Sequence, residues 1–245
     1  MSPRRTFATS GRVLRQLSHD HRTIALLFVV PVVLLGLLDW IYSSTPQIFD
    51  AIGPSLLGIF PFVMMFLTTS IATLRERSTG TLERLLAMPI GKLDIILGYA
   101  ISFGLLAMLQ AIIASLFATR VYGLDVAGPE WFLIVVAVGN AVLGAMLGLL
   151  ASAFARTEFQ AAQFMPAFIL PQLLLCGLLV PVDKLPRALE VIANVMPLTY
   201  AVDAMQHVTR ETGMSGELYK DLAVVLGFAL VALLLGAATL RRKTK

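Results

Sequence analysis

Charge is scarce in this sequence: Asp, Glu, Lys and Arg together make up 14% of the 245 residues, while hydrophobic residues make up 58%. Soluble domains carry about 25% charged and about 45–50% apolar residues. A soluble fold of this length cannot bury so much apolar surface in a single core. The scarcity of charge therefore excludes a disordered chain, a coiled coil and a nucleic-acid-binding domain, and it indicates a protein embedded in a lipid bilayer.

Cysteine and histidine are scarce as well. The one cysteine, Cys176, cannot form an internal disulfide, and its apolar surroundings predict a buried side chain rather than a reactive thiol. His19 and His21 stand two positions apart, so they do not face each other on a helix, and His207 is isolated. These residues predict no metal site and no catalytic machinery, so we expect the chain not to be an enzyme.

A nucleotide site of the usual kind is also missing. A phosphate-binding loop requires Gly, any four residues, and then Gly-Lys followed by Ser or Thr. The Gly91-Lys92 pair fails this pattern twice, because Leu86 stands where the first glycine belongs and Leu93 follows the lysine. The interiors of the apolar runs carry no ionisable residue, whereas ion-driven carriers normally place such groups at mid-membrane. We therefore expect no cofactor on this chain and an energy source on another one.

Six apolar segments are each long enough to cross a bilayer core, which takes about 20 residues. They do not alternate as barrel strands do, so the sequence predicts an all-α membrane protein. The predicted spans are residues 24–41, 52–74, 93–119, 131–155, 161–182 and 222–240. No repeat or linker divides the chain, so residues 1–245 are expected to form one transmembrane domain.

The distribution of Lys and Arg predicts the orientation. With the N-terminus inside, fourteen of the 19 Lys and Arg residues fall on the inner side. The positive-inside rule then makes both termini cytoplasmic, with the chain integral to the plasma membrane, which in a bacterium is the inner membrane. The basic N-terminal segment also has the composition of a transit peptide, but a positive cytoplasmic flank explains it equally well.

Two segments outside the spans show helical periodicity. Val13, Leu14 and Leu17 predict a short interfacial helix on the inner leaflet, and the alternative is a disordered basic tail. The external segment 183–221 predicts two short helices, separated by Pro197, that pack on or dip into the outer leaflet. Their apolar positions are Leu185, Leu189, Ile192 and Met196 in the first helix and Leu198, Ala201, Val202, Met205 and Val208 in the second.

The inner loop 75–92 combines charges with an apolar face. It contains three residues that favour a helix start, Ser78, Thr79 and Gly80. Three leucines then share one face, Leu82, Leu85 and Leu86. A charged loop is usually a solvated connector, but a connector needs no apolar face. The pattern therefore favours a short rigid helix that presents leucines and charges to the cytoplasm, as a docking element would.

At this loop the chain resembles the permease subunits of type-2 ATP-binding-cassette (ABC) exporters, a group that includes daunorubicin-resistance and polysaccharide-export permeases. The loop residues that carry the resemblance are Glu76-Arg77, Gly80-Thr81-Leu82-Glu83, Leu86 and Pro89. The resemblance continues through Gly177, Pro181, Leu185-Pro186 and residues 197–204. Ser78 departs from the family pattern, which often has a second acidic residue there.

The resemblance implies six spans, a dimer with a second permease copy or a paralogue, and separate ABC nucleotide-binding subunits that hydrolyse ATP with magnesium. It also implies that the loop helix sits in a cleft of the ATPase, whose closure moves the spans. The residues that the resemblance assigns to this coupling are Glu76, Arg77, Gly80, Thr81, Glu83, Leu86 and Pro89.

Two sets of span residues have spacings of interest. Small or polar residues recur every four positions in the fourth span, which allows close helix packing either at a dimer seam or, as we favour, within one subunit. They are Asn140, Gly144, Gly148 and Ser152. In the fifth span, two prolines are expected to bend the helix and two glutamines to satisfy the freed backbone groups, as a gate would require. They are Gln163, Pro166, Pro171 and Gln172.

Together these features predict a permease subunit that exports a hydrophobic or amphipathic molecule, such as a drug or lipid, and is powered by a separate ATPase. The uncharged span interiors favour an apolar substrate, which fits multidrug efflux. The alternatives are a polysaccharide-exporting permease, a non-transporting membrane sensor or assembly protein on the same scaffold, and an ion-driven carrier. The expected partners are the ATPase, a second permease and membrane lipid, with no nucleic acid.

Overall fold

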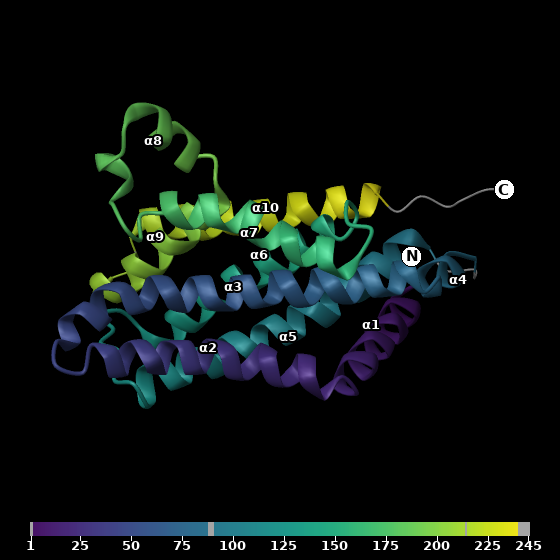
Figure 1. Ribbon diagram of the computed structural model, residues 1–245, viewed down its shortest axis with the longest axis horizontal. Coiled ribbons are helices and arrows are strands. Elements are labelled where there is room, and N and C mark those ends of the chain that lie inside the picture. Colours follow the sequence, from purple (N-terminus) through teal and green to yellow (C-terminus); the bar gives the residue numbers. More distant parts are fainter. Residues whose placement is uncertain (1, 88–90, 214, 240–245) are drawn as a thin grey trace.

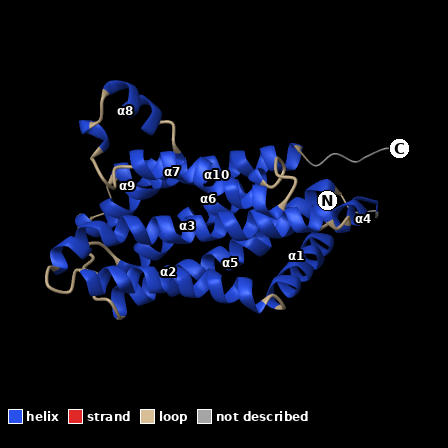
Figure 2. Ribbon diagram, viewed as in Figure 1, coloured by secondary structure: helices blue, strands red, loops and turns tan. Residues whose placement is uncertain are grey.

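The computed structural model describes residues 2–87, 91–213 and 215–239. These residues form helices and connecting loops, and the described part of the chain contains no strand (Figure 2). The prediction of an all-α protein is confirmed.

The longer helices run side by side along the long axis of the molecule (Figure 1). In chain order the α-helices are α1 Pro3–Ser18, α2 His21–Ile41, α3 Pro46–Ser78, α4 Thr81–Ala87, α5 Lys92–Arg120, α6 Glu130–Ala151, α7 Glu158–Leu175, α8 Arg187–Ala193, α9 Pro197–Arg210 and α10 Gly216–Ala238. We call the end that carries α1 and α4 the α4 end, and the end that carries α8 and α9 the α8 end. The C-terminal end of α10 lies at the α4 end as well.

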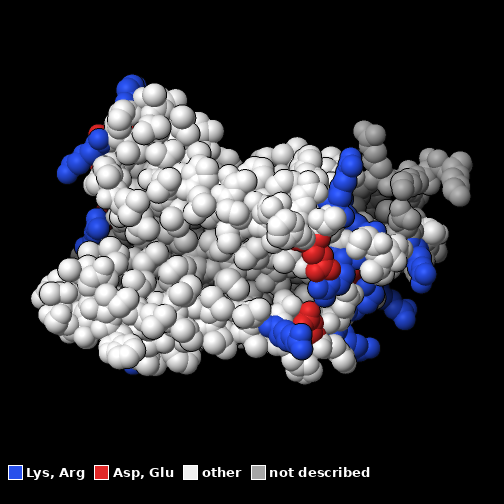
Figure 3. Space-filling model, in the orientation of Figure 1, with Lys and Arg blue, Asp and Glu red and all other residues white. Residues whose placement is uncertain are grey.

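Five described helices are long and apolar enough to cross a membrane, namely α2, α3, α5, α6 and α10. They correspond to the first four predicted spans and the last one. The number becomes six if α8 and α9, which meet at an angle of 83°, are counted as one broken span. Charged side chains gather at the two ends of the molecule, and the helix surfaces between them are almost free of charge in the view of Figure 3. This distribution is typical of an integral membrane protein.

The fifth predicted span, 161–182, is wrong in its boundaries. Helix α7 covers Glu158–Leu175 and is not among the five helices that qualify by length and composition. The helix stops because Gly177 turns the chain with a φ of +88°, in the left-handed region that glycine adopts without strain. Cys176, at this turn, is buried as expected.

Helix α3 is longer than the predicted span 52–74. Its 33 residues correspond to about 50 Å, whereas a hydrocarbon core is about 30 Å thick. The helix continues through Ser78, so Glu76 and Arg77 belong to a span helix and not to a loop. The segment after α3 is therefore joined directly to a helix long and apolar enough to cross a membrane.

The core forms where α6 packs against α3. An added Cβ at Gly144 would lie 2.1 Å from the backbone oxygen of Phe62, and one at Gly148 would lie 2.3 Å from that of Phe66. Residues larger than glycine would therefore force the two helices apart. Small residues allow this kind of close approach between membrane helices, where lipid supplies no hydrophobic driving force.

The segment 183–221 contains the two predicted helices, α8 and α9, with Pro197 at the start of the second. The apolar face of α9 is buried, and α9 packs against α3, α6 and α10 within the protein. Helix α9 therefore does not lie on the surface of the outer leaflet, and the other expected arrangement, in which this segment dips into the leaflet, stays a prediction. Helix α8 projects beyond the bundle, and its Leu189 and Ile192 are exposed (Figure 1).

Helix α1 confirms the predicted N-terminal helix and excludes the disordered tail. Val13 and Leu17 are buried, and α1 packs along the start of α5. Asp94 of α5 accepts hydrogen bonds from the backbone N–H of Ser2 at 3.0 Å and from the hydroxyl of Thr6 at 3.3 Å. These contacts attach the N-terminus firmly to the bundle.

Candidate functional site

The short helix α4 follows α3 after a tight turn at the α4 end. Gly80 has a φ of +73°, which lets the chain reverse between Thr79 and Thr81. Leu82 and Leu85 belong to the main core and are only 5% and 9% exposed. The interpretation that these leucines face the cytoplasm is therefore wrong, because the chain buries them itself. Arg84, in contrast, is exposed.

Part of the predicted coupling region is not described. Pro89 lies outside the described residues, and so do the side chains of Glu83 and Leu86. Thr81 begins α4 and is half-buried, and Thr79 contacts its hydroxyl at 3.1 Å. Helix α4 thus follows α3 without a flexible linker, because only Thr79 and Gly80 separate the two helices.

Glu76 is the centre of a buried ionic network at the end of α3. Its side chain is 4% exposed, and its two carboxylate oxygens accept bonds from the guanidinium of Arg12 at 2.9 and 3.2 Å. The Tyr99 hydroxyl of α5 donates a further hydrogen bond to the same carboxylate. This bidentate pairing is the strong geometry for an arginine and a carboxylate. Three helices, α1, α3 and α5, therefore meet at Glu76.

Electrostatics favour the charged form of Arg12 in this network. Burial opposes the charge of Arg12, but the hydrogen bonds and the negative charge of Glu76 outweigh that effect and raise the pKa of the arginine. Arg77, the next residue on α3, is partly buried, and its Nε has no hydrogen-bond partner among the described residues. The structure therefore brings Glu76 into an internal network and does not place Arg77 in it.

A second network lies one residue earlier on α3. Arg75 forms two hydrogen bonds to Glu158 at the start of α7, at 3.0 and 3.2 Å, and one to Asp20 at 3.4 Å. Asp20 also caps α2 by accepting bonds from the hydroxyl and the backbone N–H of Thr23. Those bonds, followed by the bond from Arg75, lower the pKa of Asp20. This network joins α3 to α7 and to the turn between α1 and α2.

The two networks connect α3, the helix that precedes α4, to several other helices. Arg75 and Glu76 are adjacent on α3, and together they bind α1, α5, α7 and the start of α2. Both networks lie close to α4, so the end of α3 that precedes this short helix is bonded to several helices at once.

The four predicted gate residues lie on different sides of α7. Gln163, Pro166 and Pro171 are exposed. Gln172 is buried instead: its oxygen accepts from the backbone N–H of Leu198 at 3.3 Å, and its nitrogen donates to Phe168. Gln172 therefore attaches α7 to the first turn of α9. Both prolines lie within a helix that continues past them.

The four small or polar residues of α6 face inward. Gly144 and Gly148 contact α3 of the same subunit, as described above. Asn140 is buried, and its nitrogen donates to the backbone oxygen of Ala201 in α9 at 3.0 Å. Ser152 caps the end of α6 and donates to Leu149. This stripe therefore lies against α3 and α9 and is not available to another copy.

The sequence analysis missed the partners of Glu76. By its position in the sequence, Arg12 belongs to the basic flank of the first span and Tyr99 to an apolar span. Nothing in the sequence singles out Asp20 and Glu158 as partners of Arg75. A usable signal is that ionisable residues inside membrane segments usually pair with one another or with backbone carbonyls. The sequence did not indicate which of these charges meet.

Comparisons with known proteins give this geometry a context. Residues 4–209 match the family described as "ABC-2 type transporter". The chain is 25% identical over 205 residues to "ABC transporter G family member 20" of Dictyostelium discoideum, covering 83% of this chain and 28% of that protein. It is 29% identical over 157 residues to "Probable multidrug ABC transporter permease YbhR" of Escherichia coli (strain K12), covering 63% and 42% of the two chains.

A third relative is the "Linearmycin resistance permease protein LnrN" of Bacillus subtilis (strain 168), which is 25% identical over 182 residues. This match covers 74% of the present chain and 47% of the relative. The chain thus spans less than half the length of each of these three curated relatives.

Proposed function

Because the chain belongs to the ABC-2 type transporter family, we propose that it is the membrane permease subunit of an ABC exporter and that a separate subunit hydrolyses the ATP. The observation that carries the proposal is the ionic connection of α3, beside α4, to α1, α5 and α7. An ATP-driven partner needs such a connection, since its force has to reach helices that it does not touch.

In this proposal, α4 and the residues around it are the contact with the ATPase. Gly80 sets the direction of α4, and Thr81, Glu83, Leu86 and Pro89 belong to the contact region. Glu76 and Arg77, at the end of α3, receive the movement from this contact region. Because Glu76 is buried, we propose that it passes the movement to α1 and α5 and does not touch the partner.

We further propose that two permease subunits enclose the pathway and that α7 faces it. Helix α7 leaves Gln163, Pro166 and Phe168 exposed, so a second copy or a paralogue can cover this surface. The buried Gln172 then makes the movement of α7 depend on α9. A hydrophobic or amphipathic cargo fits the uncharged helix surfaces, and the drug-resistance names of two relatives support that class.

The orientation belongs to the proposal as well. With the α4 end cytoplasmic, the ATPase side is the side on which α1, α4 and the end of α10 lie. Cysteines introduced at Ser78 and Ser215, in a Cys176→Ala background, should react with impermeant reagents from opposite sides of a plasma-membrane vesicle. Reaction of both positions from the same side would overturn this orientation.

The test of the function is reconstitution with an ABC ATPase subunit, for which a gene that neighbours the permease gene would be the first candidate. We expect the permease to capture that ATPase, and Gly80→Pro or Glu83→Ala to abolish capture or export. Glu190→Ala on α8, at the α8 end, is the matched control and should leave both unchanged. If the two α4-end variants retain full capture and export, the proposed coupling is wrong.

A further inference from the structure

A groove lies between α1, α2 and α3 at the α4 end, and Asp20 and Arg75 of the second ionic network belong to its lining. Its volume is about 200 Å³. The apolar residues that line it are Leu17, Leu26, Met64, Leu67 and Ile71. Leu26 is 58% exposed on α2, so the groove opens on the surface that we assign to the lipid.

A basic depression on α1 adjoins this groove. It is lined by Ala8, Gly11, Arg12, Arg15, Gln16 and His19. Gln16 lines both the depression and the groove, so the two adjoin at this residue. The combined surface has a basic part on the interfacial helix and an apolar part between two span helices.

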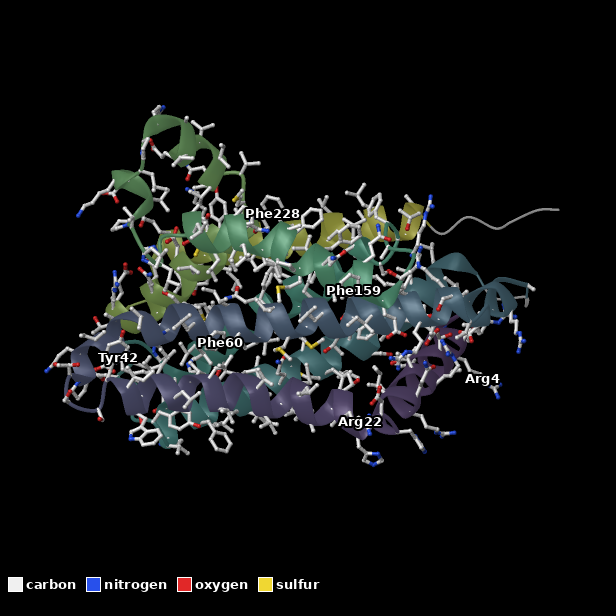
Figure 4. All side chains as sticks on the ribbon, in the orientation of Figure 1. Arg4, Arg22, Tyr42, Phe60, Phe159 and Phe228 are labelled. Atoms are coloured by element: carbon white, nitrogen blue, oxygen red, sulfur yellow. The ribbon has the colours of Figure 1, made fainter. Side chains whose placement is uncertain are left out.

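The charges of this surface are not balanced. Asp20 and Arg75 at the mouth of the groove are paired with each other, and Arg12 is paired with Glu76. Arg15 is exposed and has no ion-pair partner among residues 2–87, 91–213 and 215–239. Arg22 lies at the same end of the bundle, at the start of α2 (Figure 4). The basic part therefore attracts an anion.

We propose that this surface binds one anionic glycerophospholipid. Its phosphate lies beside Arg15 on α1, and one of its acyl chains follows the apolar groove between α2 and α3. A free phosphate ion would leave the groove unfilled, and an acidic protein surface has no chain to place in it. The position also fits, because Arg15 precedes the first span helix by a few residues and thus lies at headgroup depth.

The inference is independent of the ATPase, so its failure would leave the proposed function standing. The measurement is quenching of a tryptophan by brominated lipid. Leu26→Trp, with Trp40→Phe and Trp131→Phe, places the reporter at the mouth of the groove. The protein is reconstituted in phosphatidylcholine vesicles that contain either brominated phosphatidylglycerol or brominated phosphatidylcholine.

We expect the reporter to prefer phosphatidylglycerol by about fivefold, the factor that corresponds to about 1 kcal/mol for one arginine at a membrane surface. Arg15→Gln should reduce the ratio to about one in the same measurement, and Arg15→Lys should keep most of it. The matched control is Arg4→Gln. Arg4 is also exposed on α1 but lies about 16 Å further along the helix, beyond the screening length of about 8 Å.

Four results would overturn the proposal. Equal quenching by the two lipids would show no preference for the anionic headgroup. A ratio that Arg4→Gln lowers as much as Arg15→Gln does would indicate diffuse attraction to a basic helix. Displacement of the brominated lipid by inorganic phosphate at constant ionic strength would indicate a site for a soluble anion. An Arg15→Gln variant that loses ATPase capture but keeps its lipid preference would assign the arginine to a protein partner.

Discussion

At the α4 end, two arginine–carboxylate networks join α3 to α1, α5, α7 and the start of α2. At the α8 end, the apolar face of α9 packs into the bundle. Asn140 of α6 donates one hydrogen bond to α9, and Gln172 of α7 accepts one from α9. Ion pairs at the α8 end, such as Arg120–Glu130 and His207–Asp221, each join two helices, whereas each network at the α4 end joins three. We therefore expect the α4 end to transmit movement as a unit and the α8 end to open.

The largest expected effect concerns the α3–α6 contact, which connects the two ends. Gly144→Ala would place a methyl group 2.1 Å from the backbone oxygen of Phe62, so α3 and α6 have to separate. Overpacking typically costs about 1–3 kcal/mol and occasionally more. Because the clash here is with backbone, we expect a cost at the upper end of that range and a large fall in the unfolding temperature in detergent.

Gly227→Ala on α10 is the control for that measurement. An added Cβ at Gly227 meets no atom within 4 Å, so its unfolding temperature should equal that of the unaltered protein. Equal stability of the two variants would contradict the packing of α3 on α6.

The second prediction compares a buried carboxylate with an exposed one at the α4 end. Glu76→Ala leaves Arg12 and Tyr99 without their acceptor and should destabilise the fold by about 3 kcal/mol. Glu158→Ala removes a half-exposed partner of Arg75 and should cost about 0.5 kcal/mol. Chemical unfolding of both variants measures the difference. Similar losses of unfolding free energy would contradict the expectation that the buried carboxylate contributes more to stability than the exposed one.

The third prediction concerns the α8 end. Gln172→Leu removes the acceptor for the backbone N–H of Leu198, and a hydrogen bond between membrane helices is worth about 1 kcal/mol. We expect a small loss of stability together with faster hydrogen exchange in the first turn of α9. Gln163→Leu, on the exposed side of the same helix, should change neither quantity. An unchanged exchange rate in Gln172→Leu would mean that this hydrogen bond does not hold the first turn of α9 to α7.

The smallest expected effect is a pH dependence at Asp20. Its pKa is lowered by the bonds from Thr23 and Arg75, so its stabilising contribution is complete above the unfolded value of about 3.9 and is lost as the pH falls through the lower folded value. Asp20→Asn should therefore be less stable than the unaltered protein at pH 7 and nearly equal to it near pH 2. A stability difference that stays constant over this range would mean that the ionised form of Asp20 is not the source of its stabilising contribution.

The sequence predicted the all-α class and the helical core of every span because long apolar runs in a bilayer have few alternatives to helices. It failed at the end of the fifth span, where Gly177 turns the chain although the residues on both sides are apolar. Hydropathy does not register such a turn. It also left open whether α9 packs on the outer leaflet or dips into it, because an amphipathic pattern reveals a buried face but not the partner that buries it.

The candidate site was predictable in its position but not in its chemistry. The loop pattern indicated a short helix at α4, and Gly80 supplies the turn before it. The ionic partners of Glu76 come from positions 64 residues before it and 23 residues after it in the chain, and no local pattern encodes such pairs. The leucines gave a misleading signal, because an apolar face fits the protein's own core as well as a partner.

The most direct test of the central claim is a charge exchange across the Arg12–Glu76 pair. The claim is that this pair passes the movement of the ATPase to the spans. In proteoliposomes that contain the permease and its ATPase, Glu76→Arg alone should retain ATP hydrolysis but lose export. Adding Arg12→Glu should restore export in substantial part, because the pair re-forms with reversed charges. Export that is normal in Glu76→Arg, or that stays lost in the double variant although the protein is folded and the ATPase is bound, would contradict the account.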